Sequence, residues 1–368
     1  MKKTVSRSIS LAIILALALI FAAGCNSGSP PPAGDQPADT PPTAPASGET
    51  FHLNISFSTP EQNSVGITES LDRIQELSNG RITMTYYFSW QLSSVPTIVD
   101  DLRTGLVDMG IVPLNMHPSV FQHSTVPDIP LLGYPTTRDI GQIYDEAMAA
   151  FPILRDEYTN AGLVYYTNFP QPPYNMYTGG VDPIRTPADL AGRRLTVSDI
   201  MLQMMIDQNG GAAVAMPFPD LAIGMSTGVT EGGIIHINTM RAFGALDFAD
   251  TAIMMDGGFV TGVMALAFSQ RTWDRLPDDL KQLFIDEAPL IRDNQADFNL
   301  FLAENNERWF TEEHGGEMVW LTDSEVALWR EGLADVVDVF LDDMYGLGAT
   351  QIREVYAGVQ ELVAARVS

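Results

Sequence analysis

Strand-like and helix-like patterns alternate from residue 51 onward, and this alternation constrains the fold more than any other feature of the chain. Residues 51–57 alternate apolar and polar side chains as a half-buried strand does, and a helical pattern follows at 67–77. The order repeats with a strand at 81–88, a helix at 96–104 and a strand at 109–112. Strands joined through helices lie parallel in one sheet, and ligands bind beyond their carboxyl ends. The sequence therefore predicts an α/β fold with mostly parallel strands and a site in the loops after these three strands.

The second half of the chain predicts a further α/β region. Strands are expected at 163–167 and 174–178, and three prolines between them mark a crossing from one domain to another. A helix at 187–191 is expected to have Thr186 as its N-cap and Pro187 at its first position. Shorter strands are predicted at 195–197, 212–216 and 233–237. The chain is mostly helical from residue 273 onward, with final helices at 324–340 and 351–366.

The length and apolar content of the chain are sufficient for two domains. Its 368 residues exceed what one core usually serves, and 45% of them are hydrophobic. We expect the first domain to contain residues 51–172 and 261–300. The second domain is then expected to contain residues 173–260 and 301–368.

The first 50 residues are expected to be a targeting segment and a tether. Basic side chains precede the apolar run 11–23, which is too short to cross a bilayer, so residues 1–24 read as a secretory signal peptide. Cys25 is the only cysteine, and it follows Phe-Ala-Ala-Gly as in a bacterial lipobox. We expect it to carry a lipid anchor; the alternative is a signal peptide with an incidental cysteine. Residues 25–50 are rich in Pro, Ala and Ser and cannot form a core.

The formal net charge of −26 limits the partners of the protein. Nucleic acid and anionic lipid surfaces repel a chain with this much negative charge. We therefore expect no nucleic-acid partner. Membrane attachment would come from the lipid anchor on Cys25 instead. A solubilising surface explains most of the acidic residues.

Patterns typical of enzymes and metal sites are missing from the sequence. The histidines show no HExxH or other close metal-binding spacing. There is no P-loop, and no predicted strand is followed by GxGxxG. We therefore expect no catalytic residue, no metal and no cofactor. His236, beside a predicted strand, is the histidine to test for ligand contact, with a structural role as the alternative.

Four segments, in this order, resemble the solute-binding subunit of TRAP transporters, the DctP-type extracytoplasmic solute receptor family. They begin at Asn79, Arg103, Pro183 and Phe268 and read NGRITMT, RTGLVDMGI, PIRTPADLAGRRLTV and FSQRTWDRLP. The resemblance implies a two-domain periplasmic-binding-protein-like fold with an interdomain ligand cleft and a long C-terminal helix bracing both domains. It also implies two membrane partner subunits and a coupling ion gradient in place of ATP.

The resemblance also implies where the ligand is held. Relatives usually carry a carboxylate-gripping arginine at the position of Thr196, and many carry a second one at Asn175. Arginine makes two parallel charge-assisted hydrogen bonds to a carboxylate, whereas threonine and asparagine offer neutral single ones. Phe218 matches an aromatic residue that stacks on the ligand. We therefore expect a neutral, aromatic or weakly charged solute; the alternative is an acid held by Arg241 or by backbone amides.

Further candidate ligand-binding residues are expected near the cleft. They are Asp199, Asn238, Arg241, Asn115, Gln62 and Trp90. Each has a structural alternative: Asp199 as the N-cap of the next helix, Trp90 as core packing, Arg241 as a surface residue, and the three amides as turn residues.

The main hypothesis is an extracytoplasmic receptor, lipid-anchored through Cys25, that captures a small organic solute by hinge closure and delivers it to TRAP membrane subunits. It would lie in the periplasm or on the outer face of the cytoplasmic membrane. One alternative is a ligand-sensing protein that feeds a membrane signalling receptor. Another is a secreted hydrolase, for which the sequence offers no motif.

Overall fold

The computed structural model describes residues 48–367. The expected signal peptide, Cys25 and nearly all of the expected tether lie outside the described residues. None of the described helices combines the length and the apolar character needed to span a bilayer.

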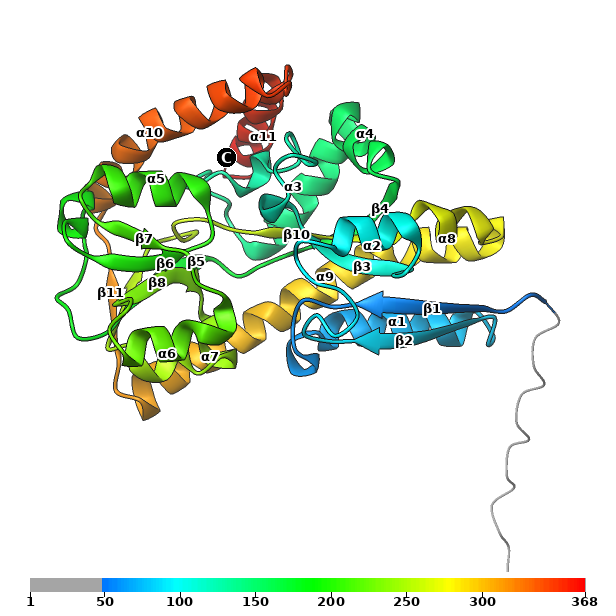
Figure 1. Ribbon diagram of the computed structural model, residues 1–368, viewed down its shortest axis with the longest axis horizontal. Helices are drawn as coiled ribbons and strands as arrows, with labels where there is room; N and C mark the ends of the chain where they lie inside the picture. Colours follow the sequence, from blue (N-terminus) through cyan, green and yellow to red (C-terminus); the bar gives the residue numbers. More distant parts are fainter. Residues whose placement is uncertain (1–47, 368) are drawn as a thin grey trace, which may run out of the picture. The chain divides into compact units, whose positions relative to one another are not determined.

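One sheet of five strands gathers the N-terminal strands (Figure 1). Its members are β1 (Phe51–Ser56), β2 (Ile82–Tyr87), β3 (Met109–Pro113), β4 (Leu163–Pro170) and β10 (Val263–Ser269). In the order β2-β1-β3-β10-β4, strand β1 is parallel to both of its neighbours and β10 is antiparallel to both of its own. The sequence predicted the first four strands and missed β10.

A second sheet of six strands has the order β11-β9-β5-β8-β6-β7. Its members are β5 (Tyr174–Thr178), β6 (Arg194–Val197), β7 (Ala212–Val214), β8 (Gly232–His236), β9 (Thr251–Met254) and β11 (Glu317–Trp320). Strand β5 is antiparallel to β8 and β9, and the other pairs are parallel. The expectation of mostly parallel strands is thus only partly met, because β5 and β10, which follow the crossings between the sheets, run against their neighbours.

Helices pack against both sheets. The longer ones are α1 (Val65–Leu77), α2 (Ile98–Thr104), α3 (Thr137–Ala150), α4 (Pro152–Asn160), α5 (Ile200–Gln208), α9 (Asp278–Arg308), α10 (Asp323–Gly346) and α11 (Ile352–Val367). The shorter ones are α6 (Leu221–Ser226), α7 (Ile237–Ala242), α8 (Gln270–Arg275), the 3-10 turns η1 (Glu61–Asn63), η2 (Leu114–Met116), η3 (Val126–Asp128), η4 (Pro187–Leu190), η5 (Phe218–Asp220) and η6 (Ala245–Phe248), and the π turn η7 (Trp309–Glu313). The helix predicted at 187–191 is therefore a single 3-10 turn, in which Thr186 and Asp189 form the expected N-terminal cap.

Helix α9 runs from the first sheet to the second (Figure 1), where it packs on β4 at one end and on α7 at the other. Its Ala303 shares an apolar cluster with Tyr177 of β5 in the second sheet. The Gln295 side chain accepts from Ile67 N–H at 3.0 Å and donates to Asn63 O at 3.0 Å, which fixes the helix to the first sheet's side. Further along, the Asn299 amide donates to Pro170 O at 3.1 Å, and Asn238 on α7 donates to the backbone oxygen of Asn299 at 2.9 Å. This long helix in the C-terminal part of the chain therefore braces both sheets, as the resemblance implied.

Helix α1 approaches α9 closely at Gly66. A Cβ atom at this buried position would lie 2.7 Å from Asn294 O and from Gln295 Cα, both backbone atoms. Because neither helix backbone can yield cheaply, we expect Gly66→Ala to lower the free energy of unfolding by about 1–3 kcal/mol in urea titrations. The control is Gly346→Ala at the end of α10, where a Cβ meets no atom within 4 Å. Equal losses in both variants would contradict the close helix contact.

Candidate functional site

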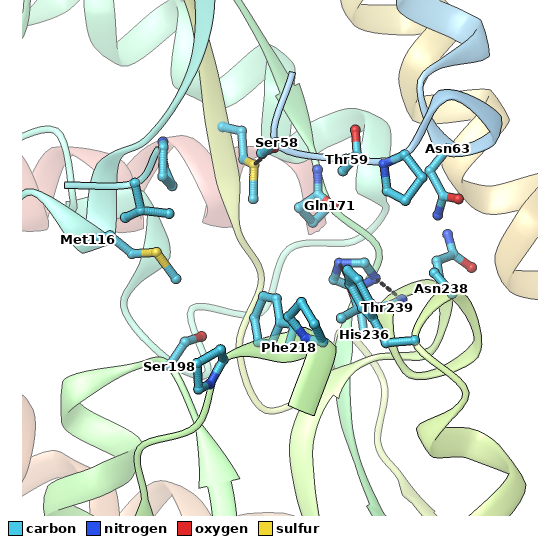
Figure 2. A pocket seen from close by; sticks show the side chains of 18 of the residues that line it. Ser58, Thr59, Asn63, Met116, Gln171, Ser198, Phe218, His236, Asn238 and Thr239 are labelled. Atoms are coloured by element: carbon cyan, nitrogen blue, oxygen red, sulfur yellow. Dashed lines mark hydrogen bonds between the residues drawn. The ribbon is translucent and has the colours of Figure 1, made fainter. Parts of the chain in front are cut away.

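A cavity of about 560 Å³ lies between the two sheets. The loops after β1, β2 and β3 form one wall, so the loops in which the sequence predicted a site do line it. The ends of β6 and β8, with η5 and α7, form the other wall (Figure 2). We call this space the central cavity.

The lining of the central cavity carries no Lys, Arg, Asp or Glu side chain among the described residues. Its one histidine, His236, is buried, and burial lowers the pKa of the imidazole to about 3. The Nδ1 atom accepts from Thr239 N–H at 3.2 Å, which leaves the proton on Nε2, 2.8 Å from Thr239 Oγ1. The ring is therefore neutral at pH 7 and caps helix α7, so the cavity has no charged wall.

Aromatic side chains face the cavity from both sheets. Trp90, in the loop after β2, has a φ of 61°, a left-handed conformation that costs about 1–3 kcal/mol and persists only when the surroundings impose it. The backbone N–H of Trp90 donates to the backbone oxygen of Phe57 at 3.0 Å, which holds the loop in place. Phe218 enters from η5 on the opposite wall, with its ring centroid 6.5 Å from that of Phe243. Such rings suit the apolar faces of a small molecule.

Four of the nine predicted ligand-binding residues line the central cavity: Trp90, Thr196, Phe218 and Asn238. Thr196 is buried at the end of β6, with Oγ1 3.5 Å from Thr230 Oγ1. Asn238 is fully engaged inside the protein, because its amide nitrogen donates to Asn299 O and its oxygen accepts from Asn306 at 2.9 Å. Phe218, which is half-buried, is therefore better placed than Thr196 or Asn238 to meet a ligand.

Asn175 and Arg241 lie outside the lining of the central cavity. Asn175 lines a second, smaller cavity of about 230 Å³, and its Oδ1 is buried without a hydrogen-bond partner. The guanidinium of Arg241 pairs with Asp247 at 3.1 Å and lies 3.7 Å above the ring of Trp309. The charge of Arg241 is thus already paired outside the central cavity, near the second sheet.

Asp199, Asn115 and Gln62 are also absent from the cavity lining. Asp199 caps α5 by accepting from Leu202 N–H at 2.8 Å, as the structural alternative held. Burial raises the pKa of its carboxyl to about 6, and the bond from Leu202 opposes that rise. Asn115 is half-buried in η2, and Gln62 is exposed in η1.

Sequence reasoning missed several polar residues of the central cavity. Gln171 lies in the short segment that joins β4 to β5, and Gln203 lies on α5. Gln295 and Asn299 reach the cavity from α9. Two signals were available: a polar residue at a proline-rich crossing, and amides four residues apart on the buried face of a long helix. No group of three or more His, Cys, Asp or Glu in residues 48–367 is arranged to hold a metal ion.

The depressed pKa of His236 predicts a loss of stability in acid. The unfolded chain binds a proton at this histidine below pH of about 6.5, whereas the folded protein does so only near pH 3. The free energy of unfolding should therefore fall as pH drops below 6.5, by about 2 kcal/mol at pH 5. In His236→Asn, which can still cap α7, urea titrations should lack this part of the decline. A decline of unchanged size in the variant would contradict the assignment.

The family model and the solved structures that resemble this chain are all of solute-binding proteins. The family model described as bacterial extracellular solute-binding protein, family 7 (DctP), matches residues 58–343. Among solved structures, a marine metagenome TRAP solute-binding protein specific for aromatic acid ligands, with 3-hydroxybenzoate, has a TM-score of 0.76 at 18% identity and covers 86% of this chain and 99% of that one. A TRAP periplasmic solute-binding protein from Desulfovibrio salexigens with bound orotic acid has a TM-score of 0.75 at 16% identity, covering 87% and 100%. One from Sulfitobacter sp. NAS-14.1 with bound β-D-galacturonate has a TM-score of 0.73 at 18% identity, covering 84% and 99%.

Proposed function

Because this chain belongs to family 7 of the bacterial extracellular solute-binding proteins, we propose that it is the extracytoplasmic receptor of a TRAP-type secondary transporter. In this role it captures a small organic solute and delivers it to the membrane subunits, without catalysis. The observation that carries the proposal is the central cavity of about 560 Å³, whose walls come from both sheets. A concave, largely apolar space of this size suits a small molecule.

Capture works by closure of two domains, residues 51–172 with 261–300 and residues 173–260 with 301–368. The connections at 171–173 and 255–262 join the sheets and are bonded to each other. Tyr174 N–H donates to Val260 O, and Phe259 N–H donates to Tyr174 O, both at 2.9 Å. Short paired connections of this kind support a hinge. A solute that touches both walls binds the closed form more tightly, and this difference in affinity drives closure.

The solute is small and uncharged or aromatic. The three structural neighbours named above hold 3-hydroxybenzoate, orotic acid and galacturonate, all of them acids. In this chain no described cation lines the central cavity, and Arg241 is already paired with Asp247. A carboxylate placed there would lose its hydration without gaining a charged partner, which is costly.

A thermal-shift screen tests the receptor function and the solute class together. Organic acids, aromatic acids, neutral aromatics, polyols and amines are compared, because a bound solute raises the melting temperature. We expect uncharged or aromatic compounds to stabilise the protein most. Phe218→Ala should weaken binding of the best compound at least about tenfold in calorimetric titrations, since the ring is lost from the cavity wall.

The matched control for Phe218 is Phe301→Ala on α9, whose side chain is exposed and outside the central cavity. This variant should bind the compound as the unmodified protein does. Stabilisation by no compound class would argue against a receptor. Stabilisation by simple carboxylates alone would argue against the solute class.

Lipid attachment at Cys25 follows from the sequence and is part of the proposal. In a bacterial host, the full chain should fractionate with membranes on the outer face of the cytoplasmic membrane. Cys25→Ser removes the thiol that would carry the lipid, so this variant should move to the soluble extracytoplasmic fraction. Asn26→Ala serves as the control and should stay with membranes. Membrane recovery of Cys25→Ser would contradict attachment at this residue.

A further inference from the structure

Gln171 lies both in a connection between the two sheets and in the lining of the central cavity. It lies in the segment 171–173, where the chain leaves the first sheet for the second. Its backbone N–H donates to Gly262 O at 2.8 Å, which ties it to the other crossing segment. The residue is only 3% exposed, and its side chain lines the central cavity between Ser58 and Thr59 on one side and His236 on the other (Figure 2).

The side-chain amide of Gln171 makes no hydrogen bond to the described residues. The contrast with Gln295 is clear, because that amide bonds to Ile67 N–H, Asn63 O and Asn299 Oδ1. Asn238 and His236 are likewise engaged with protein partners. The nitrogen and oxygen of this amide are not sealed from the cavity space, so a solute or water can pair with them where the protein does not. Gln171 offers one donor group and one acceptor to whatever occupies the cavity.

The surroundings of Gln171 disfavour an anion. Tyr174, three residues further on, lines the cavity and is buried. Burial raises the pKa of its phenol, so Tyr174 is neutral and adds no charge to this wall. With no cation in the lining, a negatively charged solute would meet only neutral dipoles.

We propose that Gln171 selects the solute, and that the solute is a neutral molecule presenting a hydrogen-bond donor beside an acceptor on a flat apolar body. A primary carboxamide, a lactam or a ureide meets this description, because it can form two N–H···O bonds with the Gln171 amide. The rings of Trp90 and Phe218 would cover the apolar body. This inference rests on the receptor function proposed above and names the chemical class that the receptor takes.

The test compares amides with carboxylates of the same shape. The pairs are phenylacetamide with phenylacetate, benzamide with benzoate, and nicotinamide with nicotinate, measured by calorimetric titration of the purified protein. At least one amide should bind about tenfold or more tightly than its carboxylate. Gln171→Leu should weaken the bound amide at least about tenfold. Gln171→Lys should reverse the order within the pair, because it adds a cation to the cavity.

Two further variants separate a specific role from a general disturbance. Gln208→Leu removes an exposed amide of α5 that lies outside the cavity lining, and it should leave affinity for the amide unchanged. Gln171→Asn keeps an amide but shortens its reach, and it should bind the amide with intermediate affinity. Melting curves without solute confirm that each variant is folded.

Three results would overturn the assignment of Gln171. They are tighter binding of the carboxylates by the unmodified protein, equal losses in Gln171→Leu and Gln208→Leu, and failure of all amides while another compound of the thermal-shift screen binds. In the last case the receptor function stands and only the role of Gln171 falls. If no compound of any class binds, the receptor function falls and the inference with it.

Discussion

The hydrogen bonds that helix α9 makes through its buried amides hold the two sheets in one structure. Gln295 bonds to the backbone around α1, and Asn299 bonds to Pro170 O at the end of β4. Asn238, at the start of α7, completes the chain of contacts from the second sheet. Because each bond joins a side chain to a backbone group of another element, the helix fixes where the sheets' edges lie, and so fixes the walls of the central cavity.

The same amides explain the polarity of the cavity. Several polar side chains reach it, yet those from α9 and α7 are consumed by the structure itself. What remains for a solute, among the described residues, is a neutral surface of aromatic rings and unpaired polar side chains, of which Gln171 is buried while Asn63, Ser198 and Gln203 are half-buried. A cavity can therefore be rich in polar residues and still offer few hydrogen bonds.

Local sequence patterns predicted half-buried strands and helix caps better than fully buried strands. Alternating strands such as β1 and the cap of α5 at Asp199 were predictable because their signals are local. Strands β9 and β10 are buried on nearly their whole length, so they lack the alternation on which the prediction relied. Helices α3 and α4 were missed although Thr136 and Pro152 mark their starts. Asn175 was matched to the second arginine of relatives by its distance along the chain from Pro183. That distance does not tell which cavity its side chain reaches, and Asn175 lines the smaller one.

The uncharged lining of the central cavity also bears on where such a protein can work. Attraction between a charged ligand and a charged pocket weakens as dissolved ions screen it, and so does the speed of encounter. A cavity that relies on rings and neutral polar groups has no such attraction to lose. Its hold on a solute would be nearly the same in dilute fresh water and in brine, while the acidic exterior keeps the protein dissolved in both.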